Sequence, residues 1–270
     1  MREIGRRIVP VIVVLSALLA VWYAAAFVVD APQGALALTR PLVPQPHQVA
    51  AALIAGIFQP LGPRSLIYHA GVTASSATVG FALAFVLGIA LAIGIVNVRI
   101  LDRSLMPWII ASQTVPALAV APMVVVVLGN IGLTGLIPKA LIAAWLSFFP
   151  IVTSMVAGLR SPERIQLDLM RTYDAGSWDV FAQLRWPSSM GFLFPGMKVA
   201  ATLAVVGAIV AELPTGAVAG LGARLLGASY YGQTLQLWAA LAMASILAVI
   251  AVAAVDAGRS VLVRVRGGRL

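Results

Sequence analysis

Long apolar segments dominate this 270-residue chain and constrain its fold more than any other feature. A helix that spans the lipid core of a membrane needs about 20 mostly apolar residues. Six stretches meet that requirement, and we predict a spanning helix for each of them. They run over residues 8–29, 77–96, 105–128, 133–157, 192–211 and 237–255. The sequence therefore predicts an all-α polytopic membrane protein with six transmembrane helices.

The composition excludes a soluble domain. Apolar residues make up 61% of the chain and charged residues 10%, whereas soluble domains average about 45–50% and about 25%. The apolar segment at 8–29 is longer than the apolar region of a secretory signal peptide, which has about 7–15 residues, so we expect it to remain as a helix. The chain has no cysteine, which excludes disulfides, thiol catalysis and cysteine-bound metals.

Basic residues set the expected orientation. The chain carries 18 Lys and Arg against 9 Asp and Glu, a net charge of +9. We attribute this excess to cytoplasmic loops beside an anionic leaflet and predict no nucleic-acid partner. With the N- and C-termini in the cytoplasm, three arginines lie outside and thirteen inside, as the positive-inside rule requires. The thirteen are Arg2, Arg6, Arg7, Arg99, Arg103, Arg160, Arg164, Arg171, Arg185, Arg259, Arg264, Arg266 and Arg269.

This topology divides the chain into four predicted parts. Residues 1–30 form an N-terminal transmembrane helix, and residues 31–69 form an extracytoplasmic segment with a short helix near 49–58. Residues 70–258 form a five-helix core that includes a cytoplasmic loop over 158–191. Residues 259–270 form a basic cytoplasmic tail.

The 158–191 loop is the longest cytoplasmic segment, and we predict two short amphipathic helices in it. Ser161 followed by Pro162 is a typical helix start, Gly176 interrupts the helix, and Pro187 ends a second one. The apolar stripes consist of Ile165, Leu169, Met170 and Tyr173 in the first helix and of Trp178, Phe181 and Leu184 in the second. Two interpretations remain open: the stripes lie on lipid headgroups, or they enter a groove on a soluble partner.

The same loop resembles a motif of the permease subunits of ATP-binding-cassette importers. The family pattern is Glu-Ala-Ala, three residues, Gly, nine residues, Ile, one residue and Leu-Pro. This chain keeps every spacing, with Asp168-Leu169-Met170, Asp174, Leu184 and Trp186-Pro187 at those places. It departs from the pattern at Asp168, Leu169, Met170, Asp174 and Trp186. Because Asp174 replaces the glycine, two alternatives follow: Gly176 supplies the turn, or the subunit pairs with a second permease whose motif is more regular.

The resemblance covers about residues 40–230 and is greatest to the subfamily that takes up nitrate, sulfonate, taurine and thiamine precursors. That family usually has Arg where Ser76 stands. The matching stretches are 42–46, Gly80-Phe81 after Thr73, 115–122, 129–139, 148–151, Gly158-Leu159, Ala211-Glu212 and 220–222.

What the resemblance implies is half of a transporter with the type I importer fold, in the inner membrane of a bacterium. Two permease subunits, of the same or different chains, enclose the pathway for a small organic or anionic solute that an extracytoplasmic binding protein delivers. Two ATPase subunits bind ATP and Mg²⁺, and this chain binds no cofactor. The residues implied to dock on an ATPase are Ile165, Asp168, Leu169, Met170, Tyr173, Asp174, Ala175, Gly176, Trp178, Phe181, Leu184 and Pro187.

Small and polar residues inside the spans have packing and functional interpretations. Lys139 and Glu212 form a structural ion pair or contact the solute. A stripe of small residues every four positions allows close helix packing; it consists of Gly80, Ala84, Gly88 and Ala92. Polar side chains of the third and fourth spans line the translocation pathway or form interhelical hydrogen bonds. These are Ser112, Gln113, Thr114, Ser147 and Thr153.

The remaining patterns argue against other functions. The chain has no Gly-Lys-Ser or Gly-Lys-Thr, hence no phosphate-binding loop of its own, and we predict no enzymatic activity. Its two histidines have no acidic cluster near them in sequence, so we predict no metal site. The alternative function is an ATP-independent secondary carrier or small channel. Such carriers place ionisable residues at mid-membrane, and the central parts of the six predicted spans have none.

Overall fold

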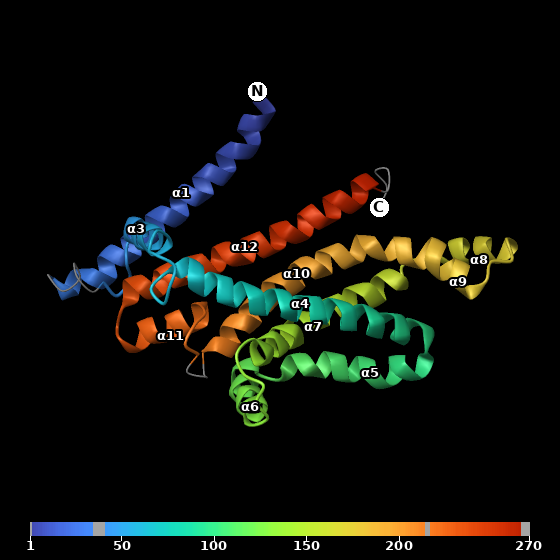
Figure 1. Cartoon of the computed structure of the whole chain (residues 1–270). Coiled ribbons are helices and arrows are strands. Elements are labelled where there is room, and N and C mark those ends of the chain that lie inside the picture. Colours follow the sequence, from blue (N-terminus) through green and yellow to red (C-terminus); the bar gives the residue numbers. More distant parts are fainter. Residues whose placement is uncertain (1, 35–40, 214–216, 266–270) are drawn as a thin grey trace.

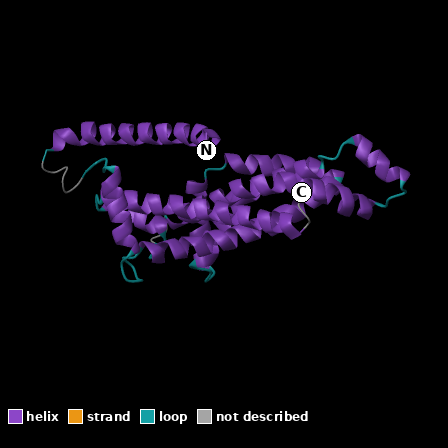
Figure 2. Ribbon diagram, turned by 90° about the horizontal axis from the view of Figure 1, so that it is seen from above, coloured by secondary structure: helices purple, strands orange, loops and turns teal. Residues whose placement is uncertain are grey.

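The computed structural model describes residues 2–34, 41–213 and 217–265, which form helices joined by short connections (Figures 1 and 2). The first half contains α1 (Arg2–Asp30), η1 (Ala31–Gln33), α3 (Pro46–Ile57), α4 (Leu66–Asn97), α5 (Arg99–Ala111), η2 (Ser112–Thr114) and α6 (Ala117–Asn130). The second half contains α7 (Leu136–Leu159), α8 (Arg164–Thr172), α9 (Ser177–Asp179), η3 (Val180–Arg185), α10 (Trp186–Glu212), α11 (Leu221–Tyr230) and α12 (Thr234–Val265).

Five helical segments in the described ranges are long and apolar enough to cross a membrane. They are Val9–Asp30, Leu66–Asn97, Leu136–Leu159, Ser177–Glu212 and Thr234–Arg264. A sixth crossing requires α5 and α6 to act as one broken span, and these two helices meet at 101°. The prediction of one continuous helix over 105–128 is therefore wrong. The other five predicted spans coincide with helices, of which α4, α10 and α12 extend further than predicted.

The bend between α5 and α6 lies at Pro116. Proline has no N–H and keeps the residue before it out of the α-helical region. Val115 is accordingly extended, with φ −78° and ψ 123°. The Ser112 and Thr114 hydroxyls donate to carbonyls three residues earlier, at 2.7 and 2.8 Å. Irregular backbone is tolerated within a membrane where such partners satisfy it.

The core of the bundle centres on α7, which packs against both α4 and α10. Small residues allow this close approach. A Cβ atom at Gly80 of α4 would lie 2.6 Å from the Ala140 carbonyl oxygen of α7. One at Gly207 of α10 would lie 2.7 Å from Ala143 Cα. The buried residues of α4 include the whole predicted stripe, Gly80, Ala84, Gly88 and Ala92.

The first helix lies apart from this bundle (Figures 1 and 2). Its described side chains are mostly exposed and apolar, a surface that is stable in lipid. Near its end, Trp22 Nε1 donates to the Pro44 carbonyl at 3.1 Å, and its ring centroid lies 5.3 Å from that of Trp238. The α1 helix is thus attached to the bundle through its C-terminal half.

The connecting segments gather at two opposite ends of the bundle (Figure 1). One, the α11 end, holds α3, α11 and the starts of α4 and α7. The other, the α8 end, holds α8, α9 and the C-terminal ends of α4 and α7. The helix expected near 49–58 is present as α3. His69 was expected in the outer segment but lies in the first turn of α4, because that helix begins at Leu66.

Candidate functional site

The first helix of the loop at the α8 end begins later in the sequence than predicted. Glu163, not Ser161, is the N-cap residue of α8. The N–H of Glu163 donates to Gln166 Oε1 at 2.9 Å, as in a capping box. Ser161 Oγ instead donates to the Gly158 carbonyl at 2.8 Å. The predicted start is wrong because Ser161 is used at the C-terminus of α7.

Asp174 makes the turn that follows α8. Its N–H donates to the Arg171 carbonyl at 3.0 Å, and the Ala175 N–H donates to the Met170 carbonyl at 3.1 Å, the two bonds of a Schellman motif. Asp174 has a φ of 51°, in the left-handed region that favours glycine and that aspartate tolerates better than most residues. Gly176 has a φ of −67°. The alternative in which Gly176 supplies the turn is therefore wrong.

The second helix of the loop does not end at Pro187. Residues Ser177–Glu212 form one continuous helical segment, in which Pro187 occupies the first turn of α10. This proline directly follows η3, a π-helical stretch over Val180–Arg185. The Phe181 ring centroid lies 5.6 Å from that of Trp178 and 6.0 Å from that of Trp186. Aromatic contacts therefore connect the loop to the start of α10.

This loop carries exposed apolar side chains. Ile165, Tyr173 and Trp178 are 73%, 76% and 74% exposed, and Leu169 is also exposed. We call these four side chains the α8 face. They belong to a segment that projects beyond the end of the bundle (Figures 1 and 2). Among the other residues implied to dock, Asp168, Asp174, Gly176 and Pro187 are exposed and Met170, Ala175, Phe181 and Leu184 are half-buried.

A buried carboxylate joins four helices at the α11 end. Glu212, the last residue of α10, is 0% exposed. It accepts hydrogen bonds from Thr73 Oγ1 of α4 at 3.0 Å and from the Gly222 N–H of α11 at 2.9 Å. Lys139 Nζ of α7 lies 3.6 Å from Glu212 Oε1 and donates to the Ala219 carbonyl at 2.9 Å. Buried charges need such partners, and here all of them come from one chain.

Two residues of α4, one turn apart, hold the loop before α11. The Gly220 N–H donates to His69 Nδ1 at 3.0 Å, and the Leu221 N–H donates to Thr73 Oγ1 at 2.9 Å. His69 Nε2 lies 2.9 Å from the Pro63 carbonyl, so the contacts fit a ring with its proton on Nε2. We call His69, Thr73, Lys139, Glu212 and the backbone of 219–222 the Glu212 cluster.

Sequence reasoning missed His69 and Thr73 as members of this cluster. The available signal was their spacing, because polar side chains four residues apart share a helix face. A second signal was Gly220, whose φ of 130° and ψ of 162° are essentially restricted to glycine. A Cβ atom there would contact the Glu212 carboxyl group. Gly220 is 151 positions from His69, so no local pattern reveals that they meet.

A cavity of about 540 Å³ lies beside the Glu212 cluster. Its walls come from α4, α6, α7 and the loop before α11. Its polar lining side chains are Tyr68, Ser75, Ser76, Thr134 and Lys139. We call it the Lys139 cavity. Among the described residues, no group of three or more His, Asp or Glu side chains is placed to hold a metal ion.

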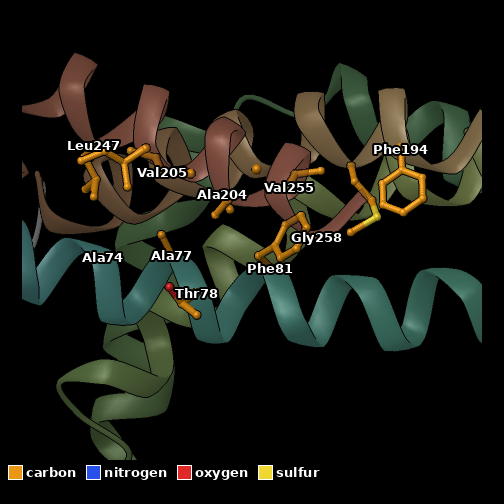
Figure 3. Close-up of a pocket in the computed structure, with 15 residues that line it drawn as sticks. Ala74, Ala77, Thr78, Phe81, Phe194, Ala204, Val205, Leu247, Val255 and Gly258 are labelled. Atoms are coloured by element: carbon orange, nitrogen blue, oxygen red, sulfur yellow. The ribbon is translucent and has the colours of Figure 1, made fainter. Parts of the chain in front are cut away.

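A second hollow, of about 400 Å³, is an apolar groove between α4, α10 and α12 (Figure 3). Phe81 of α4, Val205 of α10 and Leu247 of α12 are among the side chains that line it. Almost all of its lining side chains are apolar. Such a surface has few groups that could orient a polar solute.

The predicted pathway residues lie in two separate places. Ser112 and Gln113, at the α5–α6 bend, line a cavity of about 250 Å³, and Thr114 lies exposed beside it. Ser147 is buried in α7, and its hydroxyl donates to a carbonyl four residues earlier at 2.7 Å. Thr153 makes the same kind of bond at 2.9 Å. The hydroxyls of Ser147 and Thr153 are thus used within their own helix.

Comparison with known proteins gives consistent matches. Residues 84–264 match the family described as the binding-protein-dependent transport system inner membrane component. The riboflavin transport system permease protein RibX of Chloroflexus aurantiacus is 33% identical over 175 residues, or 64% of this chain and 63% of RibX. The formylaminopyrimidine transport permease protein ThiX of Halalkalibacterium halodurans is 33% identical over 181 residues, or 67% and 68%. The chain thus spans somewhat less than two thirds of the length of RibX and slightly more than two thirds of the length of ThiX.

The family match agrees with the structure in extent and in kind. It runs from the middle of α4 almost to the end of α12 and includes the loop that carries the α8 face. The apolar helices within it are those of a multi-pass membrane protein. The chain belongs to the family of binding-protein-dependent transport system inner membrane components, the permease subunits of ABC transporters.

Proposed function

We propose that this chain is a permease subunit of an ATP-driven importer and forms half of its translocation pathway. A second permease subunit, the same or a different chain, supplies the other half. Two ATPase subunits bind ATP and Mg²⁺ on the cytoplasmic side, and this chain binds no cofactor. An extracytoplasmic binding protein delivers the solute to the α11 end. The termini and the α8 end lie in the cytoplasm of a bacterial cell, and the chain lies in its inner membrane.

The α8 face is the observation that carries this proposal. It exposes Ile165, Leu169, Tyr173 and Trp178 together on a segment that projects from the bundle. An exposed apolar patch on a short helix is the type of surface that enters a groove on a partner. Charged residues lie between these apolar residues in the sequence. They include Asp168 and Arg171, whose Oδ1 and Nη1 atoms lie 3.0 Å apart. The charges do not suit the lipid interior, and the projection of this segment beyond the bundle (Figure 1) favours a groove on a partner over the lipid headgroups.

The solute is proposed only by class. RibX is named for riboflavin transport and ThiX for formylaminopyrimidine transport. The sequence resemblance adds nitrate, sulfonate, taurine and thiamine precursors. We propose a small organic or anionic solute from this range.

A single substitution at Tyr173 tests the docking role. Tyr173→Asp places a charge in the middle of the α8 face, and burial of an unpaired carboxylate in a groove is costly. We expect at least a tenfold loss of copurification with a co-expressed ABC ATPase subunit, with roughly 1.4 kcal/mol for each factor of ten. Membrane insertion should not change, because Tyr173 lies outside the bundle.

The matched control is Tyr173→Phe, which keeps the apolar ring and removes only the hydroxyl. It should retain the ATPase at the level of the unmodified chain. Equal copurification with Tyr173→Asp and Tyr173→Phe would show that the α8 face does not dock on the ATPase.

A further inference from the structure

We infer that the Lys139 cavity is a subsite that solute occupies on entry and that it selects uncharged organic molecules over anions. The inference rests on the proposed function, since it assumes that solute arrives at the α11 end. It narrows the solute class proposed above, which includes anions.

The place of the cavity suits entry from the outer side. It is lined by the first turns of α4, the end of α6, the start of α7 and the loop before α11. All of these segments lie at the end of the bundle opposite to the α8 face. Its volume of about 540 Å³ is within the range of small-molecule sites, roughly 300–1,000 Å³.

The charge of the cavity is balanced within the chain. Lys139 is the one charged side chain among the described residues that line it, and it lies 3.6 Å from the buried Glu212 carboxylate. An anion entering the cavity would compete with Glu212 for the ammonium group and would also be repelled by that carboxylate. Like charges repel strongly in a low-dielectric site. The pair therefore leaves no net attraction for an anion.

The cavity still offers hydrogen-bond donors. An ammonium group has three N–H bonds; one from Lys139 is donated to the Ala219 carbonyl, and another is within reach of Glu212. Among the described residues no further acceptor takes the third, which can therefore be donated to an acceptor in the cavity. Tyr68 contributes a half-exposed aromatic ring and its hydroxyl on the same wall. The exposed Ser75 hydroxyl already donates to the Val72 carbonyl at 2.8 Å and is left as an acceptor.

The remaining lining is aliphatic. Val72, Val125, Leu136, Pro138 and Val218 are the larger apolar side chains of the wall. Apolar walls with a few fixed polar groups are typical of sites for small organic molecules. The chemistry that fits is an uncharged molecule with a flat or apolar body and a carbonyl or amide oxygen that accepts from Lys139.

Charged and uncharged thiol reagents test this inference on a chain that has no cysteine of its own. Ser75→Cys places a thiol in the cavity, and Gln59→Cys places one on the exposed outer segment. The probes are methyl methanethiosulfonate, which is uncharged, and its sulfonatoethyl analogue, which is an anion. The ratio of the two rates cancels differences in thiol ionisation. We expect the anionic reagent to have no relative advantage at Ser75→Cys over Gln59→Cys.

Removing one member of the ion pair should change that ratio in opposite directions. In Ser75→Cys with Glu212→Gln, the uncompensated ammonium group should raise the relative rate of the anion about tenfold. In Ser75→Cys with Lys139→Gln, the relative rate should fall. A relative rate for the anion in Ser75→Cys alone that already exceeds the Gln59→Cys value tenfold would overturn the inference, as would failure of both reagents to react there.

The assembled transporter separates this inference from the proposed function. N-phenylmaleimide is an uncharged reagent that fills space, so its attachment at Ser75→Cys should abolish the ATP hydrolysis that the binding protein stimulates, and attachment at Gln59→Cys should not. If an ATPase copurifies and this activity survives labelling at Ser75→Cys, the inferred subsite is disproved, although the proposed permease function stands. If no ATPase associates with the chain, the proposed function fails, and the reagent ratios alone still decide the charge preference of the cavity.

Discussion

The two ends of the bundle present opposite combinations of polarity and burial. At the α11 end, Glu212 is charged and fully buried, and Thr73, Lys139 and Gly222 of the same chain surround its carboxylate. At the α8 end, Tyr173 and the rest of the α8 face are apolar and exposed. A buried charge is stable only with its partners, whereas an exposed apolar patch marks a surface that meets another protein or a membrane.

The contrast predicts where substitutions act. The α11 end is complete within one chain, so changes there should alter the stability of the permease itself. Under the proposed function another subunit covers the α8 end, so changes there should alter assembly and leave the fold unaffected. The Tyr173→Asp test addresses the second statement, and the following predictions address the first and then the boundary between them.

Glu212→Ala should produce the largest loss of stability. It leaves the Lys139 ammonium group without its counter-ion and the Gly222 N–H without its acceptor in a buried site. Removal of one member of a buried ion pair costs about 3–5 kcal/mol, which for a chain of this size corresponds to a fall in Tm of about 10 °C. Thermal unfolding of the purified chain in detergent measures it.

Asp168→Ala is the matched control at the α8 end. Asp168 also forms an ion pair, with Arg171 at 3.0 Å, but both side chains are largely exposed. Exposed pairs contribute little, so Tm should stay within about 1 °C of the unmodified chain. An equal fall in Tm for Asp168→Ala and Glu212→Ala would remove the distinction between the two ends.

Gly220→Ala should destabilise the chain by a smaller amount. The backbone at Gly220, with φ 130° and ψ 162°, is strained for any residue with a Cβ atom, at a cost of about 1–3 kcal/mol. The added methyl group would also displace the Glu212 carboxyl group. The same thermal measurement should show an intermediate fall in Tm.

Gly227→Ala separates this effect from a general response to alanine in α11. Gly227 lies within that helix, and a Cβ atom there would meet nothing within 4 Å. Alanine is favoured over glycine in a helix by about 1 kcal/mol, so Tm should rise slightly. A fall for Gly227→Ala that matches the fall for Gly220→Ala would show that Glu212 is not the cause.

The parts of the fold that the sequence predicts well depend on local properties. A spanning helix needs only its own apolar residues, so five of the predicted spans coincide with helices. The bend in the remaining one depends on packing. Pro107 and Pro122 lie inside α5 and α6 without breaking them, and Pro116 breaks the chain between them. Three prolines in one apolar stretch do not indicate which one will bend the chain.

The candidate sites divide in the same way. Lys139 and Glu212 were identifiable because charges are rare in such a chain and need partners. His69 and Thr73 were not, because their contacts with 220–221 depend on how α4 and α11 meet. In the α8 loop, the glycine rule favoured a turn at Gly176. Because α8 ends at Thr172, the residue with left-handed backbone is Asp174 instead.

Asp174→Gly should give the smallest effect and test the boundary between fold and docking. Asp174 has a φ of 51°, and glycine adopts that conformation without the cost of about 1 kcal/mol or more that a side chain pays. Because the Schellman hydrogen bonds use only backbone atoms, the turn should keep its shape and α8 should become more stable. A gain of about 1 kcal/mol slows amide exchange about fivefold, which hydrogen–deuterium exchange of the α8 amides measures, while copurification with the ATPase should not change.

Asp174→Asn is the control, because asparagine tolerates the left-handed region as aspartate does but lacks the charge; its exchange rates should match those of the unmodified chain. Faster exchange in Asp174→Gly would mean that the Asp174 carboxylate stabilises the loop. A loss of ATPase binding in both variants would mean that the carboxylate itself contacts the partner, and the exposed end would then recognise charge as well as apolar surface.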